Sequence, residues 1–301
     1  MGSDRKRVDY LLPSSFIFFQ LLLGGLLLGG IYALVAFGLS TIYGVAKLFN
    51  FAHGTFLVMA GIIASYIYFS FEVNPFIIML MVAPLFLVVG FIFFGFFKPI
   101  SGRSPLEFVV GTVLITVGLM FVMDDVSLML VGGRIWSIPY SLPSIPIGEL
   151  MVSSTRLWGL IAVVVITILL SLYIRRSYVG KAIRAATQDR EAAMLTGVDV
   201  SKTTMFAFGI AMVLVAIGSV LYCMVLTVAP FGGFPMTVKC FTIVVLGGIG
   251  SIIGSLVGGI ILGTSEAFVG YYFGLPWSEA VSIIILLIVL VIRPQGLFGF
   301  R

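Results

Sequence analysis

Few side chains in the long apolar runs of this chain could take part in chemistry, and the ionisable ones are His53, Lys239, Glu266 and Glu279. An ionisable group is costly in hydrocarbon, so each of them is a candidate functional residue. Lys239 opens a short apolar run and Glu266 lies in the next one, which makes the two residues a possible charge pair. His53 follows Asn50, whose side-chain oxygen could cap the helix that begins there. For His53, a structural hydrogen-bonding role is the alternative to proton transfer.

Motifs for hydrolysis and redox chemistry are missing from the sequence. Gly180-Lys181 lacks the upstream glycine and the following Ser or Thr of a nucleotide-binding loop. The chain has no HExxH metal-binding helix and no GxSxG nucleophile elbow. Its two cysteines, Cys223 and Cys240, have neither CxxC spacing nor a neighbouring His. We therefore expect no catalytic residue, no metal site and no enzymatic activity in this chain.

The most specific polar pattern lies in a charged segment at 175–204. Small residues are interspersed with charges over 180–186 and 189–198, which predicts two short amphipathic helices. Gly197 is expected to follow the second helix at its C′ position. Such a compact element can insert into a cleft of another protein, and a solvated connector is the alternative.

Glycine spacing indicates close packing between helices. The chain has 35 glycines, and Gly250, Gly254 and Gly258 recur every four residues. The tandem LLLGG repeat at 21–30 also places glycines four apart. Small residues at this spacing let helix backbones approach closely in lipid, so we expect both regions to pack against other helices.

A short apolar run at 237–246 is bounded by Gly232 and Gly233 on one side and by Gly247 and Gly248 on the other. It is too short to span comfortably, because a spanning helix needs about 20 residues. A short segment interrupted by Gly and Pro is typical of a discontinuous helix whose free backbone groups can face a solute. The segment is therefore a candidate lining of a translocation path.

Membrane-spanning helices must position these features. Of 301 residues, 60% are apolar and only 10% are charged, and the mean hydropathy is +1.23, far outside the range of soluble domains. Long apolar runs, rather than alternating ones, predict helices and not barrel strands. The sequence predicts one all-α polytopic membrane domain over 1–301, with roughly eight to nine spans. Much of the net charge of +5 comes from loop Lys and Arg that orient such a protein, so we expect no nucleic-acid partner.

The predicted spans are 16–45, 51–71, 76–97, 106–123, 157–174, 205–228, 237–246, 252–269 and 277–292. Lys and Arg in short loops predict their orientation. The 175–204 loop is expected to be cytoplasmic, together with the 98–105 loop, the turn at Lys47 and, if 237–246 crosses, Arg293.

The 124–156 segment is then extracytoplasmic. It contains Pro139, Pro143 and Pro146, which prevent regular helix, and it is either a docking surface or a structural loop. The same alternation places Arg5 to Arg7 outside, against the charge rule. Either the 16–45 run hides a break near its Gly pairs or the rule fails at this end of the chain.

Four ordered motifs give the chain a family resemblance. EAAMLTG at 191–197 resembles the EAA---G loop of ABC importer permeases, and GKAIRAATQDR at 180–190 resembles the version found in branched-chain amino acid permeases. YGVAKLFNFAHGTFLVMAG at 43–61 is similar to the signature of that family. VVLGGIGSIIGSLVGGIILG at 244–263 and RPQGLFG at 293–299 match its C-terminal pattern. The Ile-x-Leu-Pro ending of the general EAA motif is absent, as it tends to be in the branched-chain branch.

The resemblance implies the permease subunit of an ATP-driven importer in the inner membrane of a bacterium or archaeon. It implies a second homologous permease, two cytoplasmic subunits that hold ATP and Mg, and an extracytoplasmic solute-binding protein as partners. Coupling to the ATPase would involve Gly180, Arg184, Asp189, Glu191, Ala192, Ala193 and Gly197. The translocation path would involve Asn50, His53, Gly232, Gly233, Gly247 and Gly248.

Branched-chain amino acids are the default substrate of this family, and urea, amides or another small solute are the alternatives. Two other classes stay open: an ion-coupled secondary carrier, and a membrane-integral receptor or scaffold that moves no solute. The scarcity of carboxylates within the spans weighs against ion coupling. A path with so few charges suits a small, weakly polar or zwitterionic solute.

Overall fold

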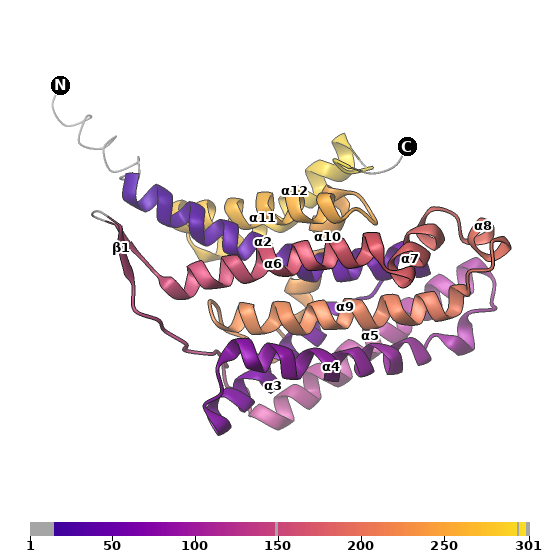
Figure 1. Ribbon diagram of the computed structural model, residues 1–301, viewed down its shortest axis with the longest axis horizontal. Coiled ribbons are helices and arrows are strands. Elements are labelled where there is room, and N and C mark those ends of the chain that lie inside the picture. Colours follow the sequence, from indigo (N-terminus) through magenta and orange to yellow (C-terminus); the bar gives the residue numbers. More distant parts are fainter. Residues whose placement is uncertain (1–14, 148–149, 294, 299–301) are drawn as a thin grey trace.

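The computed structural model describes residues 15–147, 150–293 and 295–298, and its helices lie side by side along one long axis (Figure 1). In these residues, 8 helices are long and apolar enough to cross a membrane. They are α2 (Ser15–Ala46), α3 (His53–Phe71), α4 (Pro75–Gly95), α5 (Pro105–Val131), α6 (Ser154–Arg176), α9 (Val200–Cys223), α11 (Ile252–Phe273) and α12 (Leu275–Ile292). A shorter apolar helix, α10 (Gly233–Gly247), completes the bundle. The predicted polytopic all-helical fold with one short helix is confirmed.

The bundle has two chemically different ends (Figure 1). One carries an antiparallel hairpin of β1 (Ile145–Ile147) and β2 (Leu150–Val152), which we call the hairpin end. The other carries η1 (Lys98–Ile100), α7 (Tyr178–Gln188) and α8 (Arg190–Leu195), which we call the coupling end. The loops predicted to be cytoplasmic lie at the coupling end. The 72–74 turn lies at the hairpin end, where Asn74 Nδ2 donates to Tyr140 Oη at 3.1 Å.

One predicted helix boundary is wrong, and one of the alternatives left open for the first span is excluded. The 16–45 run has no break near its Gly pairs, because α2 is one continuous helix of 32 residues. The fourth span does not end at Met123: α5 continues through buried Asp124 to Val131 and ends only where Gly132 adopts φ +61°. Gly132 can take this left-handed conformation, whereas the apolar residues before it continue the helix. The side of Arg5 to Arg7 stays a prediction, since these residues lie outside the described ranges.

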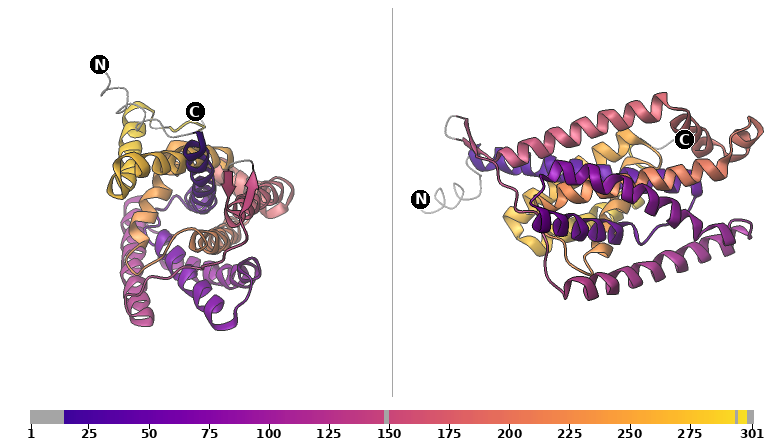
Figure 2. Two further views of the ribbon diagram at one scale, coloured as in Figure 1. Left: turned by 90° about the vertical axis from the view of Figure 1, so that its left-hand side faces the viewer. Right: turned by 60° about the horizontal axis from the view of Figure 1, so that its bottom comes forward.

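Helix α2 is central and packs against α6, α9, α10 and α11. Its glycines meet those of α11: a Cβ on Gly29 would lie 2.6 Å from the carbonyl oxygen of Gly259. The predicted close packing of both glycine-rich regions is therefore confirmed. Viewed along the bundle, α11 and α12 lie to one side of α2 (Figure 2). Helix α9 contacts α2, and α3 and α4 pack on the side of α9 that faces away from α2.

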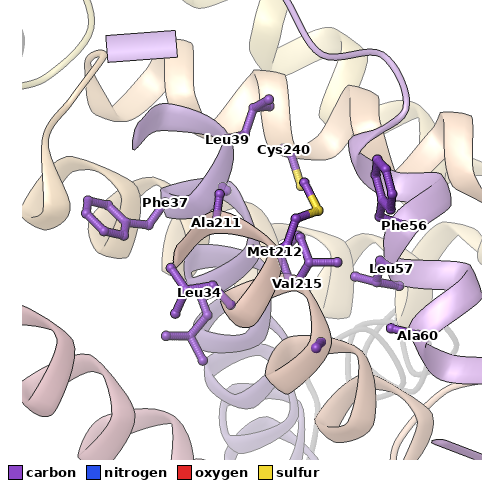
Figure 3. Packing of buried hydrophobic residues seen from close by; sticks show 14 of the residues in the cluster. Leu34, Phe37, Leu39, Phe56, Leu57, Ala60, Ala211, Met212, Val215 and Cys240 are labelled. Atoms are coloured by element: carbon purple, nitrogen blue, oxygen red, sulfur yellow. The ribbon is translucent and has the colours of Figure 1, made fainter. Parts of the chain in front are cut away.

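The hydrophobic core forms where α2, α3, α9 and α10 meet (Figure 3). Leu39 of α2, Leu57 of α3 and Met212 of α9 are almost fully buried there. Cys240 of α10 is fully buried in the same cluster. Both described cysteines, Cys223 and Cys240, are free thiols and act as packing residues.

Candidate functional site

Helix α3 begins inside the bundle rather than at its surface. After α2 ends at Ala46, the chain turns at Lys47, which has φ +54°, and returns into the protein. His53 is fully buried, and its Nε2 lies 2.9 Å from the carbonyl oxygen of Val35. Val35 lies about 16 Å along α2 from Ala46, at a rise of about 1.5 Å per residue. The chain therefore has a second interrupted region beside α10, which the sequence analysis did not identify.

The starts of α3 and α10 meet at this depth and form what we call the α3–α10 junction (Gly54, Thr55, Gly233 and Thr237). The backbone N–H of Gly54 donates to Thr237 Oγ1 at 2.8 Å, and this hydroxyl lies 3.0 Å from the carbonyl oxygen of Phe51. A Cβ on Gly54 would overlap the carbonyl oxygen of Gly233. Both glycines are therefore required by the close contact between the two helix starts.

Asn50 and His53 lie beside this junction and are buried. Asn50 Oδ1 accepts from the backbone N–H of Ala52 at 3.1 Å, so it closes a turn before α3 instead of capping a residue inside the helix. Because the Val35 carbonyl can only accept, His53 Nε2 carries the proton and its Nδ1 is the acceptor. Within the described structure, His53 Nδ1 and Asn50 Nδ2 have no hydrogen-bond partner. Their role in a translocation path stays a prediction.

A buried ionic network joins three helices on the hairpin side of the junction. Lys239 Nζ lies 3.0 Å from Glu266 Oε2, so the predicted charge pair between α10 and α11 is confirmed. Tyr32 of α2 donates to the same carboxylate oxygen at 3.0 Å. The aromatic Tyr32 carries no sequence signal that separates it from other apolar-run residues, and only the tertiary structure brings it to the pair.

Two cavities flank α10. The hairpin-side cavity, of about 190 Å³, is lined by Gly232, Lys239 and Glu279 among others. The coupling-side cavity, of about 610 Å³, is lined by Lys47, Phe241 and others. The α3–α10 junction lies between these two groups of residues, and the ring of Phe241 packs beside it at 5.6 Å from that of Phe51.

The predicted path glycines occupy different places along α10. Gly232 lines the hairpin-side cavity, and Gly233 belongs to the α3–α10 junction. Gly247 packs against the backbone of Gly254 at the start of α11. Gly248 ends α10 with φ +92°. The structure thus brings Gly233 against Gly54 and Thr55, directly after His53 in α3, but it places Gly247 and Gly248 at the other end of α10.

The predicted amphipathic pair in the 175–204 segment is present as α7 and α8. Gly180 packs so closely on the backbone of Ile174 that a Cβ would overlap it. Asp189 caps α8, since its Oδ1 accepts from the backbone N–H groups of Glu191 and Ala192 at 2.9 Å each. Gly197 follows α8 with φ +86°, as expected for a C′ glycine.

The outer face of α8 mixes charge with apolar surface. Glu191 and Ala192 of α8 are exposed, as is Arg184 of α7, whereas Ala193 of α8 is buried. Leu195 is 90% exposed and Met194 is 50% exposed at the end of α8. Met194 and Leu195 together place an adjoining pair of exposed apolar side chains among charged residues, which makes this surface a candidate protein interface. Leu195 was not predicted from the sequence, although it lies in the EAAMLTG motif, two residues before Gly197.

The segment continues into α9 through a charged cap. Asp199 Oδ1 accepts from the backbone N–H of Lys202 at 3.0 Å, and Asp199 Oδ2 lies 3.3 Å from Lys202 Nζ. The backbone hydrogen bond is the main reason that the pKa of the Asp199 carboxyl is lowered. Among the residues that the structure describes, no group of three or more His, Cys, Asp or Glu side chains could hold a metal ion.

The family model and the curated relatives that match this chain all carry the name of a branched-chain amino acid transport permease. Residues 21–290 match the family model described as branched-chain amino acid transport system / permease component. The chain is 31% identical to the high-affinity branched-chain amino acid transport system permease protein BraD of Pseudomonas aeruginosa, over 96% of this chain and 98% of BraD. It is 30% identical to the permease protein LivH of Salmonella typhimurium, with the same coverage. The solved structure of PsaBC from Streptococcus pneumoniae in complex with Fab aligns with a TM-score of 0.49 and 14% identity, over 97% of this chain and 96% of that one.

Proposed function

The chain belongs to the permease-component family of branched-chain amino acid transport systems, and from this premise we propose that it forms the membrane path of an ATP-driven importer. Its solute would be a branched-chain amino acid delivered by an extracytoplasmic binding protein. A second homologous permease and two cytoplasmic subunits that hold ATP and Mg would complete the assembly. The membrane is then the inner membrane of a bacterium or archaeon.

The observation that carries this proposal is the pair of cavities that flank α10 on opposite sides of the α3–α10 junction. Alternating access requires a site that opens to one side of the membrane at a time. Separation of the starts of α3 and α10 would join the two cavities. The two helix starts meet in direct contact at Gly54 and Thr237, so a movement of α10 relative to α3 would act on this junction.

The α7–α8 element supports coupling to an ATPase. Leu195 and Met194 project from a helix that Asp189 caps and Gly197 ends, so the apolar surface is held on a defined support. Helix α7 in turn contacts α2 and α9, which border the core. Movement of α8 by a bound ATPase would therefore reach the helices around the α3–α10 junction.

Reconstitution tests this function. The chain is co-expressed with its partner subunits, and uptake of radiolabelled leucine into proteoliposomes is measured with and without ATP. The Leu195→Ser variant is expected to lose most ATPase co-purification and most ATP-dependent uptake. Leu106→Ser is the matched control, because Leu106 is also strongly exposed, at 75%, but lies on α5.

Two outcomes would overturn the proposal. Leucine uptake that follows a proton or sodium gradient without ATP would identify a secondary carrier. If Leu195→Ser retains the bound ATPase and takes up leucine with ATP at the wild-type rate, the exposed surface of α8 does not couple the ATPase to transport.

A further inference from the structure

The hairpin-side cavity combines one cationic and one anionic side chain with aliphatic walls. Lys239 enters its lining from α10 and Glu279 from α12. Leu57 and Val58 of α3 and Met236 of α10 form apolar parts of the same wall. Opposite charges over an aliphatic surface are chemically complementary to a small zwitterion with an aliphatic side chain.

The ammonium of Lys239 keeps a donor for such a ligand. Its Nζ is 3.0 Å from Glu266 Oε2 and 3.3 Å from Tyr32 Oη. An ammonium has three donors, so two are used and one remains. The Lys239 side chain is 13% exposed, whereas that of Glu266 is 4% exposed. Glu266 and Tyr32 therefore hold the ammonium in place, while the cavity reaches Lys239.

Glu279 differs from Glu266 because it lacks a partner. In the described part of the chain, its exposed carboxylate makes no hydrogen bond or ion pair. A carboxylate on a membrane-spanning helix is costly unless it meets a cation or water. A bound ammonium group would supply that cation.

We propose that the hairpin-side cavity binds the transported amino acid, with its carboxylate at Lys239, its ammonium at Glu279 and its side chain against Leu57, Val58 and Met236. This assignment rests on the importer function proposed above. Neutral urea or an amide would leave both charged residues unpaired, so the site discriminates against those solutes. The cavity of about 190 Å³ has room for on the order of six water molecules, which limits it to a small solute.

The Glu279→Gln variant tests the ammonium contact. Loss of one charge-assisted hydrogen bond is expected to lower the rate of ATP-driven uptake about tenfold or more when the binding protein is saturated with leucine. Glu72→Gln is the matched control, since Glu72 is exposed at the hairpin end but does not line the cavity. It is expected to transport leucine like the wild type.

A labelling measurement tests binding directly. Thr227 is an exposed residue of the cavity lining, and Thr227→Cys leaves both charges intact. Cys223 and Cys240 are buried and give little background. In the purified complex, leucine is expected to slow the reaction of Thr227→Cys with a polar maleimide several-fold, whereas urea does not. Adding Glu279→Gln to Thr227→Cys should abolish this protection. Ser141 does not line the cavity, so leucine should not protect Ser141→Cys from the maleimide.

Failure of the importer function and failure of the substrate site give different results. If the wild-type complex shows no ATP-driven leucine uptake, the proposed function fails. If the wild type imports leucine but Glu279→Gln behaves like Glu72→Gln and leucine does not protect Thr227→Cys, the substrate site is wrong and the importer function stands. A wild-type complex in which urea protects Thr227→Cys as well as leucine does would also overturn the zwitterion assignment.

Discussion

Glycine at position 29 is required by contact between two backbones and not by its own conformation. A Cβ at this position would lie 2.6 Å from the carbonyl oxygen of Gly259 and 2.7 Å from the Cα of Ile260. Backbone atoms cannot rotate away as a side chain can. In lipid, such close approach is a main source of helix association. A methyl group at this position must therefore separate α2 from α11.

Gly29→Ala is expected to destabilise the protein by about 1–3 kcal/mol through overpacking. Gly118→Ala is the matched control, because Gly118 is also helical and a Cβ there meets nothing within 4 Å. The control should be neutral or slightly stabilising, since Ala favours helix over Gly. Thermal unfolding of both purified variants in the same detergent measures the difference. Equal melting temperatures would show that α2 and α11 can separate without cost.

The cost of removing a charged side chain differs between the buried pair of Lys239 and Glu266 and the exposed Glu279. Removal of one partner of a buried pair leaves an unpaired charge, at a cost of about 3–5 kcal/mol. Glu279, which lies exposed on α12, carries no such penalty when it is neutralised. Glu279→Gln therefore changes the cavity charge without the loss of stability expected from a change at Lys239 or Glu266.

At the scale of elements, two helices start inside the protein. Helix α3 starts at buried His53, and α10 starts at Gly233, directly against Gly54. Free N–H groups of helix starts are tolerated at such depth only when protein or water satisfies them. Thr237 Oγ1 satisfies the N–H of Gly54, so a side chain of one broken helix completes the other.

The left-handed conformation of Gly197 ends α8 and can be tested by substitution. Gly197 has φ +86° and open space around its Cβ position, so substitution there strains the backbone without a clash. Gly197→Leu is expected to cost about 1–2 kcal/mol locally and to reduce leucine-dependent ATPase activity.

Gly197→Asn is the control, because Asn tolerates the left-handed conformation better than other non-glycine residues. It should retain most coupling. The ratio of transported leucine to hydrolysed ATP is measured for both variants. Full coupling in Gly197→Leu would show that the geometry at the end of α8 is unimportant.

At the scale of the whole molecule, positive charge separates the two ends of the bundle. The coupling end carries Lys47, Lys98, Arg103, Arg175, Arg176, Lys181, Arg184, Arg190, Lys202 and Arg293. In the described residues, the hairpin end carries Arg134 in the loop after α5 and Arg156 in the first turn of α6. From this asymmetry we expect the coupling end to face the cytoplasm.

Two near-isosteric cysteine variants test this orientation. Ser101 and Ser141 are exposed at the coupling end and the hairpin end, respectively. A membrane-impermeant maleimide is expected to label Ser141→Cys from outside intact cells and Ser101→Cys only in inverted vesicles. The buried native cysteines make the parent chain a suitable unlabelled control. The reverse pattern would invert the assigned topology.

The sequence by itself determined the membrane class, most of the spans and the pair of short helices in the 175–204 segment. These features depend on local patterns: long apolar runs, loop charge, and a Gly197 placed where a short helix must end. The pair of Lys239 and Glu266 could also be proposed, because isolated charges in apolar runs have few possible partners.

Only the tertiary structure decided where α3 starts, how far α5 extends, and which residues meet across helices. The position of His53 against Val35, the addition of Tyr32 to the ion pair, and the cavity between Lys239 and Glu279 depend on how helices distant in sequence cross. In lipid, hydrophobicity does not distinguish one apolar helix face from another, so packing of small residues selects the neighbours. Hydropathy therefore located the helices, and the contacts of Gly29, Gly54 and Gly233 decided their arrangement.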